Sequence, residues 1–81
     1  MFYVYAIKSL LKNYIYVGMT EDLERRLEEH NAGKARSTKA YRPFKIIFSE
    51  IQPDSVEARK REKFLKSGIG KEFLKKLANL S

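Results

Sequence analysis

Apolar residues gather in three short runs that predict β-strands. Residues 2–7 (FYVYAI) are β-branched and aromatic with little polar alternation, a pattern typical of a strand covered on both faces. Tyr14–Val17 follows a polar turn and predicts the second strand of a hairpin, ended by Gly18. Phe44–Glu50 (FKIIFSE) predicts a third strand later in the chain.

A helical period replaces this pattern after the hairpin. Leu23 and Leu27 are four residues apart, so they lie on one face of a helix. Thr20 is suited to cap the N-terminus of that helix, and Gly33 is suited to follow its C-terminus. We therefore expect a first helix over residues 21–31.

Two more helices are expected after the third strand. Asp54 is followed three residues later by Glu57, a capping-box-like spacing that predicts a helix over about 55–67. A glycine-containing break at 67–70 ends it, and a short third helix follows from the spacing of Phe73, Leu74, Leu77 and Leu80. The order β-β-α-β-α-α predicts an α+β domain, with helices packed on a small, mainly antiparallel three-stranded sheet.

The composition excludes several classes of protein. A length of 81 residues fits a single domain, 1–81, with a small core. The absence of cysteine excludes zinc fingers, thiol enzymes and disulfide-stapled secreted scaffolds. The longest apolar run, Met1–Ile7, is far shorter than the roughly 18 residues of a membrane span and is not flanked as a signal peptide is. We therefore expect a soluble cytoplasmic domain with no membrane partner.

Positive charge is concentrated in one loop. The chain has 17 Lys and Arg against 10 Asp and Glu, a net charge of +7. Residues 34–45, here called the basic loop, contain no acid, and their cations are Lys34, Arg36, Lys39, Arg42 and Lys45. Tyr41 and Phe44 lie between these cations, which suits neutralisation of nucleic-acid phosphates together with stacking on bases. A solvated loop is the alternative interpretation, but the net charge of the chain favours nucleic acid.

Arg26 and His30 are neighbours on the first predicted helix. They are four residues apart and flank the leucine stripe, so they lie near the edge of the core. A guanidinium beside an imidazole can hold a phosphate oxygen, as a planar charged fork and a second donor. The alternative is that Arg26 pairs with Asp22 and that His30 caps the helix near the surface.

Glu62 lies in a partly apolar stripe of the second predicted helix. Ala58, Glu62 and Leu65 stand at positions i, i+4 and i+7, so the carboxylate faces the core and needs a cation. A lysine or arginine could supply the positive charge. A hydrated Mg²⁺ could do so as well, because that ion often takes only one or two protein carboxylates.

Tyr5 and Tyr16 lie in the two strands of the predicted hairpin, where Tyr3 has the parity of Tyr5 and Tyr14 that of Tyr16. Aromatic residues in strands are ordinarily core or cross-strand partners. A hydroxyl near a cation could instead act as a general base, if its pKa falls far enough below about 10.

Together these residues resemble the GIY-YIG nuclease superfamily. The letters VYA (4–6) and YVG (16–18) resemble its paired strand motifs, and Arg26 with His30 meets the Arg-x-x-x-His spacing of its helix. The segment EARKREKFLK resembles the later helix that carries the family's metal-binding glutamate, which falls on Glu62. The resemblance covers nearly the whole chain and is closest to short, stand-alone members of the family.

The resemblance implies a metal-dependent endonuclease that hydrolyses phosphodiester bonds in DNA, with Mg²⁺ or Mn²⁺ as cofactor. Tyr5 and Tyr16 would line the site, and one of them, with Tyr16 preferred, is the candidate general base for water. Arg26 would stabilise charge on the phosphate, His30 would orient a tyrosine or phosphate oxygen, and Glu62 would hold one divalent ion.

The resemblance leaves the source of specificity open. Larger relatives carry extra domains that choose the DNA target, so specificity here is expected from the basic loop, from the basic third helix or from a protein partner. The expected substrate is DNA, including branched or damaged DNA in repair or recombination. A non-catalytic nucleic-acid-binding module is the alternative function, and an adaptor domain with a vestigial site is a third.

Overall fold

The computed structural model describes residues 1–80 as one three-stranded sheet with three α-helices and a short 3₁₀ turn. The sheet has the order β2-β1-β3, and both pairs of neighbours are antiparallel. The elements are β1 (Phe2–Ser9), β2 (Ile15–Thr20), α1 (Leu23–Asn31), the turn Lys39–Tyr41, β3 (Phe44–Gln52), α2 (Ser55–Lys66) and α3 (Gly68–Leu80). The predicted α+β class and element order are therefore confirmed. Within residues 1–80, no helix combines the length and the apolar character needed to cross a membrane.

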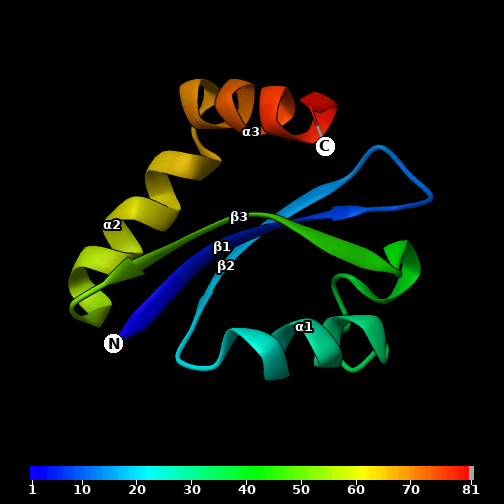
Figure 1. The fold of residues 1–81 in the computed structure, drawn as a ribbon, viewed down its shortest axis with the longest axis horizontal. Coiled ribbons are helices and arrows are strands. Elements are labelled where there is room, and N and C mark those ends of the chain that lie inside the picture. Colours follow the sequence, from blue (N-terminus) through cyan, green and yellow to red (C-terminus); the bar gives the residue numbers. More distant parts are fainter. Residues whose placement is uncertain (81) are drawn as a thin grey trace.

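Helices cover both faces of the sheet. Figure 1 shows α1 on one side of the strands and α2 and α3 on the other. The central strand β1 alternates between the two sides: Val4 and Ala6 belong to the core under α2 and α3, whereas Tyr5 and Ile7 belong to the core under α1. This two-sided burial explains why the run at 2–7 has almost no polar alternation.

The N-terminus of α1 differs from the prediction by two residues. Asp22 is the N-cap, because its side chain accepts a hydrogen bond of 3.1 Å from the backbone N–H of Arg25. The hydroxyl of Thr20 instead accepts from the N–H of Asp22 and shapes the turn before the helix. Both residues offer a short-range oxygen, so the sequence pattern does not separate them. The C-terminus agrees with the prediction: α1 ends at Asn31, and Gly33 has a φ of 80°.

The break predicted after the second helix is confirmed, because α2 ends at Lys66 and Ser67 is extended, but two glycines expected at the ends of elements lie inside them. Gly18 is within β2, paired with Tyr5, and Gly70 is in the first turn of α3. A Cβ at Gly70 would meet the carbonyl oxygen of Phe64 and the Cα of Leu65, both backbone atoms of α2. The glycine is therefore needed for the close approach of the two helices, and it does not break the helix that contains it.

The Gly70→Ala substitution should lower the free energy of unfolding by about 2–3 kcal/mol, since the backbone of α2 has no side-chain freedom with which to move aside. Gly68→Ala is the matched control in the same helical turn, because nothing lies within 4 Å of the added Cβ. We expect that control to be neutral or slightly stabilising. Urea denaturation followed by circular dichroism measures both, and equal stabilities would contradict the close packing.

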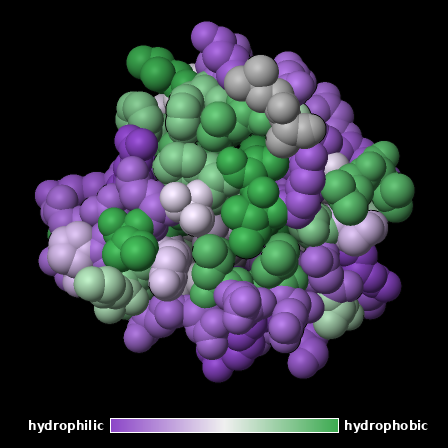
Figure 2. Space-filling view, viewed as in Figure 1, coloured by the Kyte–Doolittle hydropathy of each residue, from purple (hydrophilic) through white to green (hydrophobic). Residues whose placement is uncertain are grey.

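The strand β3 forms one edge of the sheet and leaves apolar side chains exposed. Figure 2 shows an apolar area over β3 and the adjoining part of α3. Exposed apolar side chains of these two elements are Ile46, Ile51, Ile69 and Phe73. Incomplete cover of this kind is expected for a short chain, and Lys45 and Glu50 interrupt the strand with charge. The opposite edge strand, β2, carries Tyr16.

Candidate active site

Tyr5, on the central strand, has the predicted site residues around it. Its side chain is 1% exposed, and its hydroxyl oxygen lies 2.9 Å from Nε2 of His30. The ring of Tyr16 is 6.2 Å from that of Tyr5 and 4.9 Å from that of His30, measured between centroids. The structure therefore brings the two tyrosines and the histidine together in one cluster on the α1 side of the sheet.

Gly18 makes room for this cluster. A Cβ at this position would lie 2.8 Å from Oη of Tyr5 and 2.9 Å from Cε2 of Tyr16. Contacts of that length do not occur between real side chains, so any larger residue would push the two rings apart. The glycine of the second tyrosine motif is thus explained by the space that the rings require.

Arg26 lies on α1, one helical turn before the histidine. Its side chain is 34% exposed, and its Nη1 donates to Oε1 of Glu29 at 3.0 Å, so its helical partner is Glu29 and the pairing with Asp22 is not formed. Burial lowers the pKa of Arg26, but side-chain interactions with Glu29, Tyr5 and Tyr16 outweigh that effect and raise it. The guanidinium is therefore a permanent positive charge beside both tyrosines.

The Tyr5–His30 pair is neutral near pH 7. Burial raises the pKa of Tyr5 to about 12, with smaller contributions in the same direction from Tyr16 and Glu62 and an opposing one from Arg26. Burial and, to a smaller extent, the charge of Arg26 lower the pKa of His30 to about 4. Each group is thus held in its uncharged form by the same apolar surroundings.

His30 is deeper than a surface cap. It is fully buried, and its second ring nitrogen, Nδ1, lies 2.7 Å from Oγ1 of Thr38, which is also fully buried. Sequence analysis did not identify Thr38 as a site residue. Its contact joins a helix to a loop eight residues later, and no periodicity signals such a pair.

The burial of neutral His30 predicts a loss of stability in acid. The unfolded chain takes up a proton on this ring below pH 6.5 or so, whereas the folded chain resists protonation down to about 4. The free energy of unfolding should therefore fall as the pH falls through this window, by about 2–3 kcal/mol between pH 7 and pH 4.5. Urea titrations of the wild type and of His30→Gln at both pH values measure this term. An equal loss in both proteins would contradict it.

Glu62 lies on α2, on the other side of the sheet from α1 (Figure 1). It lies between the buried residues Ala58 and Leu65, at the predicted spacing, and its side chain is 17% exposed. Its Oε2 is 3.4 Å from Nζ of Lys66, a long ion pair within the helix. The negative charge of Glu62 is near enough to raise the pKa of Tyr5. Its link to the cluster is thus electrostatic and acts through space.

The carboxylate of Glu62 is suited to bind one hydrated divalent ion. Within residues 1–80, no three His, Cys, Asp or Glu side chains lie close enough together to form a protein cage for a metal. A single mostly buried carboxylate, held only by a long ion pair, suits Mg²⁺ or Mn²⁺, which prefer oxygen ligands. Mg²⁺ in particular keeps several waters and completes its shell with substrate phosphate.

The basic loop follows α1 and presents a cationic cavity. Arg36, Lys39 and Arg42 line a cavity of about 550 Å³ together with Ala40. Arg42 is held in position, because its Nη1 donates to the carbonyl of Lys39 at 3.0 Å and its guanidinium packs over Gly33. The loop therefore offers oriented positive charge to an anionic ligand.

The two aromatic residues of the basic loop are not placed for stacking on bases. Phe44 is 4% exposed and belongs to the core under α1. Tyr41 is half-buried and already stacks on Tyr14, with ring centroids 3.9 Å apart and planes 9° apart. The expectation of base stacking by this pair is wrong, because packing between the loop and the hairpin uses both rings.

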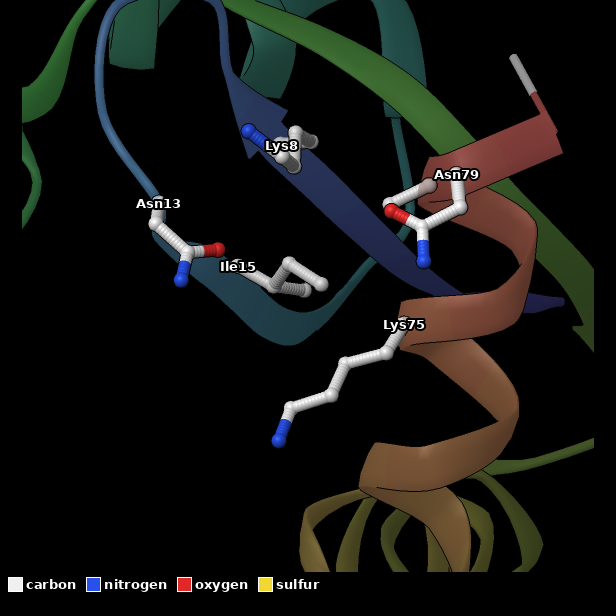
Figure 3. A pocket seen from close by; sticks show the side chains of 6 residues that line it. Lys8, Asn13, Ile15, Lys75 and Asn79 are labelled. Carbon is white, nitrogen blue, oxygen red and sulfur yellow. The ribbon is translucent and has the colours of Figure 1, made fainter.

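Another cavity lies between the hairpin loop and α3. It has a volume of about 250 Å³, and its lining includes Lys8, Asn13, Ile15 and Lys75. Figure 3 shows Lys75 reaching out from α3, whereas the amino group of Lys8 turns toward the hairpin loop. That amino group donates to two backbone carbonyls, at 2.9 and 3.0 Å. None of the five predicted catalytic residues lines this cavity.

Comparison with known proteins identifies a family and several relatives. The GIY-YIG catalytic domain matches residues 1–76. A UPF0213 protein of Staphylococcus haemolyticus is 38% identical over 74 residues, which cover 90% of this chain and 89% of that protein. The UPF0213 protein YazA of Bacillus subtilis is 41% identical over 66 residues, covering 80% of this chain and 64% of that protein. The solution NMR structure of a UPF0213 protein from Bacillus halodurans is similar with a TM-score of 0.55 at 33% identity, over 95% of this chain and 85% of that one.

Proposed function

This chain belongs to the family of the GIY-YIG catalytic domain, and from that premise we propose that it is a metal-dependent endonuclease that hydrolyses phosphodiester bonds in DNA. The family supports a nuclease-type role. The observation that carries the finer proposal is the convergence of Tyr5, Tyr16, Arg26 and His30 in one cluster, with the charge of Glu62 near enough to act on it. The four clustered residues come from two strands and one helix, β1, β2 and α1, so the fold brings a cation, hydroxyl groups and an imidazole to one place.

Arg26 is proposed to bind the scissile phosphate. A phosphorus under attack by water gains negative charge on its equatorial oxygens, so a fixed cation at that point lowers the barrier. The half-buried guanidinium is charged at any working pH and is held by Glu29 on its own helix. Its planar donors can bind two phosphate oxygens at once.

Tyr16 is proposed to be the general base. Tyr5 is a poor candidate, because its hydroxyl contacts His30 and burial raises its pKa to about 12. Tyr16 is half-buried on the edge strand, beside the same guanidinium, where a water molecule can reach it. Tyr5 and His30 then serve as neutral groups that orient the cluster.

Glu62 is proposed to hold one Mg²⁺ or Mn²⁺ ion. Such an ion supplies Lewis-acid stabilisation of the phosphate oxygens and of the leaving oxygen. The carboxylate of Glu62 is positioned for this by the burial of its helix on the sheet, with Ala58 and Leu65 on either side. Its exposure of 17% leaves a route for an ion and a substrate to reach it.

The most direct test is a cleavage assay. Purified protein is incubated with supercoiled plasmid and with a branched DNA junction, in Mg²⁺, in Mn²⁺ and in EDTA. We expect nicking with either metal and none in EDTA. Cleavage that persists in EDTA would contradict the metal requirement. Salt-sensitive binding without cleavage under either metal would favour a non-catalytic nucleic-acid-binding module.

The basic loop is proposed to bind backbone phosphates through Lys34, Arg36, Lys39, Arg42 and Lys45. If Arg36 and Lys39 each contact one phosphate of duplex DNA, Arg36→Ala with Lys39→Ala should reduce the slope of log K against log salt by about 1.8. Fluorescence anisotropy at several salt concentrations measures this slope. Lys60→Ala with Lys66→Ala, on α2, is the control pair with the same loss of charge. Equal slopes for the two pairs would contradict a specific role of the loop.

A further inference from the structure

Three buried side chains form a continuous line of polar contacts from the basic loop to the tyrosine cluster. Oγ1 of Thr38 is 2.7 Å from Nδ1 of His30, and Nε2 of His30 is 2.9 Å from the hydroxyl of Tyr5. Thr38 and His30 are fully buried and Tyr5 is 1% exposed. No buried side-chain nitrogen or oxygen within residues 1–80 lacks a hydrogen-bond partner. The line is therefore fully hydrogen-bonded, and the donors and acceptors available at its two ends favour one direction.

The Thr38 end of the line favours one direction. The hydroxyl of Thr38 has an acceptor of its own in the carbonyl oxygen of Ala35, at 3.4 Å, which also accepts from the backbone N–H groups of Thr38 and Lys39. When the hydroxyl donates to Ala35, its oxygen accepts from the ring, and Nδ1 of His30 carries the hydrogen. A neutral imidazole has a single N–H, which leaves Nε2 as an acceptor.

The Tyr5 end is compatible with the same direction. The positive charge of Arg26 lowers the pKa of Tyr5, and a guanidinium can only donate. With the proton of Tyr5 pointing to Nε2 of His30, its oxygen keeps its lone pairs for the guanidinium and for the reacting water. In the reverse direction Nε2–H would donate to the tyrosine oxygen. The tyrosine proton would then face Nε2–H and the guanidinium, and neither of these groups can accept it. That arrangement is costly for a buried group.

We propose that Thr38 is a positioning residue, which holds His30 in the Nδ1–H tautomer so that Tyr5 donates to His30 and presents only acceptor lone pairs to the reaction centre. The catalytic part of this role rests on the proposed nuclease function, whereas the tautomer does not. Thr38 lies between the exposed residues Arg36 and Lys39. The same short segment therefore presents cations to solvent and the hydroxyl that fixes the His30 tautomer to the interior. A loop displaced from its native position would thus lose phosphate contacts and tyrosine orientation together.

The experiment uses the fact that His30 is the only histidine of the chain. Long-range ¹H–¹⁵N spectra of the imidazole report directly which nitrogen carries the proton. We expect a protonated Nδ1 and an unprotonated Nε2 in the wild type. Thr38→Val, which keeps the shape and removes the hydroxyl, should shift the ring toward a mixture of tautomers and reduce the single-turnover cleavage rate at saturating DNA by roughly tenfold.

Two further variants separate positioning from structure. Thr38→Ser keeps the hydroxyl and should restore both the Nδ1–H tautomer and the cleavage rate. Ser37→Ala removes the neighbouring, exposed hydroxyl and should change neither. A wild-type ring protonated at Nε2 would overturn the proposal even if Thr38→Val did not fold, and so would a Thr38→Val ring with unchanged tautomer and rate. A wild type that cleaves no DNA would instead count against the nuclease function, and the spectra would still decide the role of Thr38.

Discussion

Replacing Glu62 by Gln should reduce DNA cleavage in Mg²⁺ on the order of 10³-fold. Binding of a divalent ion is worth several kcal/mol of stabilisation in phosphodiester hydrolysis, which corresponds to two to four powers of ten in rate. The charge of Glu62 acts on Tyr5, and the other carboxylate that acts on the cluster, Glu29, is already paired with Arg26. The amide has the same shape, and the partner that Glu62 has among the described residues, Lys66, is 55% exposed, so the fold should keep nearly all of its stability.

Glu57→Gln is the matched control for this variant. It lies on the same helix, is 47% exposed and also pairs with a lysine at i+3, so it removes the same charge away from the cluster. Single-turnover rates at saturating DNA, with Mg²⁺ and Mn²⁺ titrated over both variants, separate loss of metal affinity from loss of fold. If Glu62→Gln cleaves DNA as fast as Glu57→Gln, the carboxylate of Glu62 does not hold the catalytic ion.

Local sequence signals predicted the elements of this fold better than their ends. The cap of α2 was identified correctly, because Asp54 and Glu57 have no competing pair nearby, and the side chain of Asp54 does accept from the N–H of Glu57. Gly18 and Gly70 were interpreted as stops. Their roles depend on what lies opposite them across the sheet and across a helix pair, and local propensity does not contain that information.

The helical spacing of Arg26 and His30 and the stripe around Glu62 could be predicted from the sequence, but neither pattern alone distinguished a catalytic role from a structural one. The resemblance to the GIY-YIG superfamily favoured the catalytic role and also singled out Tyr5 and Tyr16. Other features depend on how the basic loop folds against α1 and the hairpin. These are the burial of His30, its contact with Thr38 and the packing of Tyr41 and Phe44. No periodicity in the sequence predicts such contacts between distant segments.

Removing Arg26 should have the second largest effect on cleavage. Loss of a preorganised donor to a developing oxyanion costs on the order of 10²–10³ in rate, and Arg26→Ala should show a reduction of that size at saturating DNA. Arg26→Lys should recover part of it, since an ammonium keeps the charge but cannot donate to two oxygens in a planar fork. Arg25→Ala is the control: it is the adjacent residue, its side chain is 71% exposed, and its ion pair with Glu29 is long, at 3.9 Å.

The same variant has a second, independent readout. The charge of Arg26 lowers the pKa of His30 and lowers that of Tyr5, so its removal should raise both values while Arg25→Ala leaves them nearly unchanged. The imidazole signals of the single histidine follow this shift as the pH is lowered, without any DNA present. A loss of cleavage without a rise in the pKa of His30 would place Arg26 away from the cluster in solution. A rise in the pKa of His30 without a loss of cleavage would confirm that Arg26 lies beside the cluster but would show that its guanidinium does not take part in the reaction.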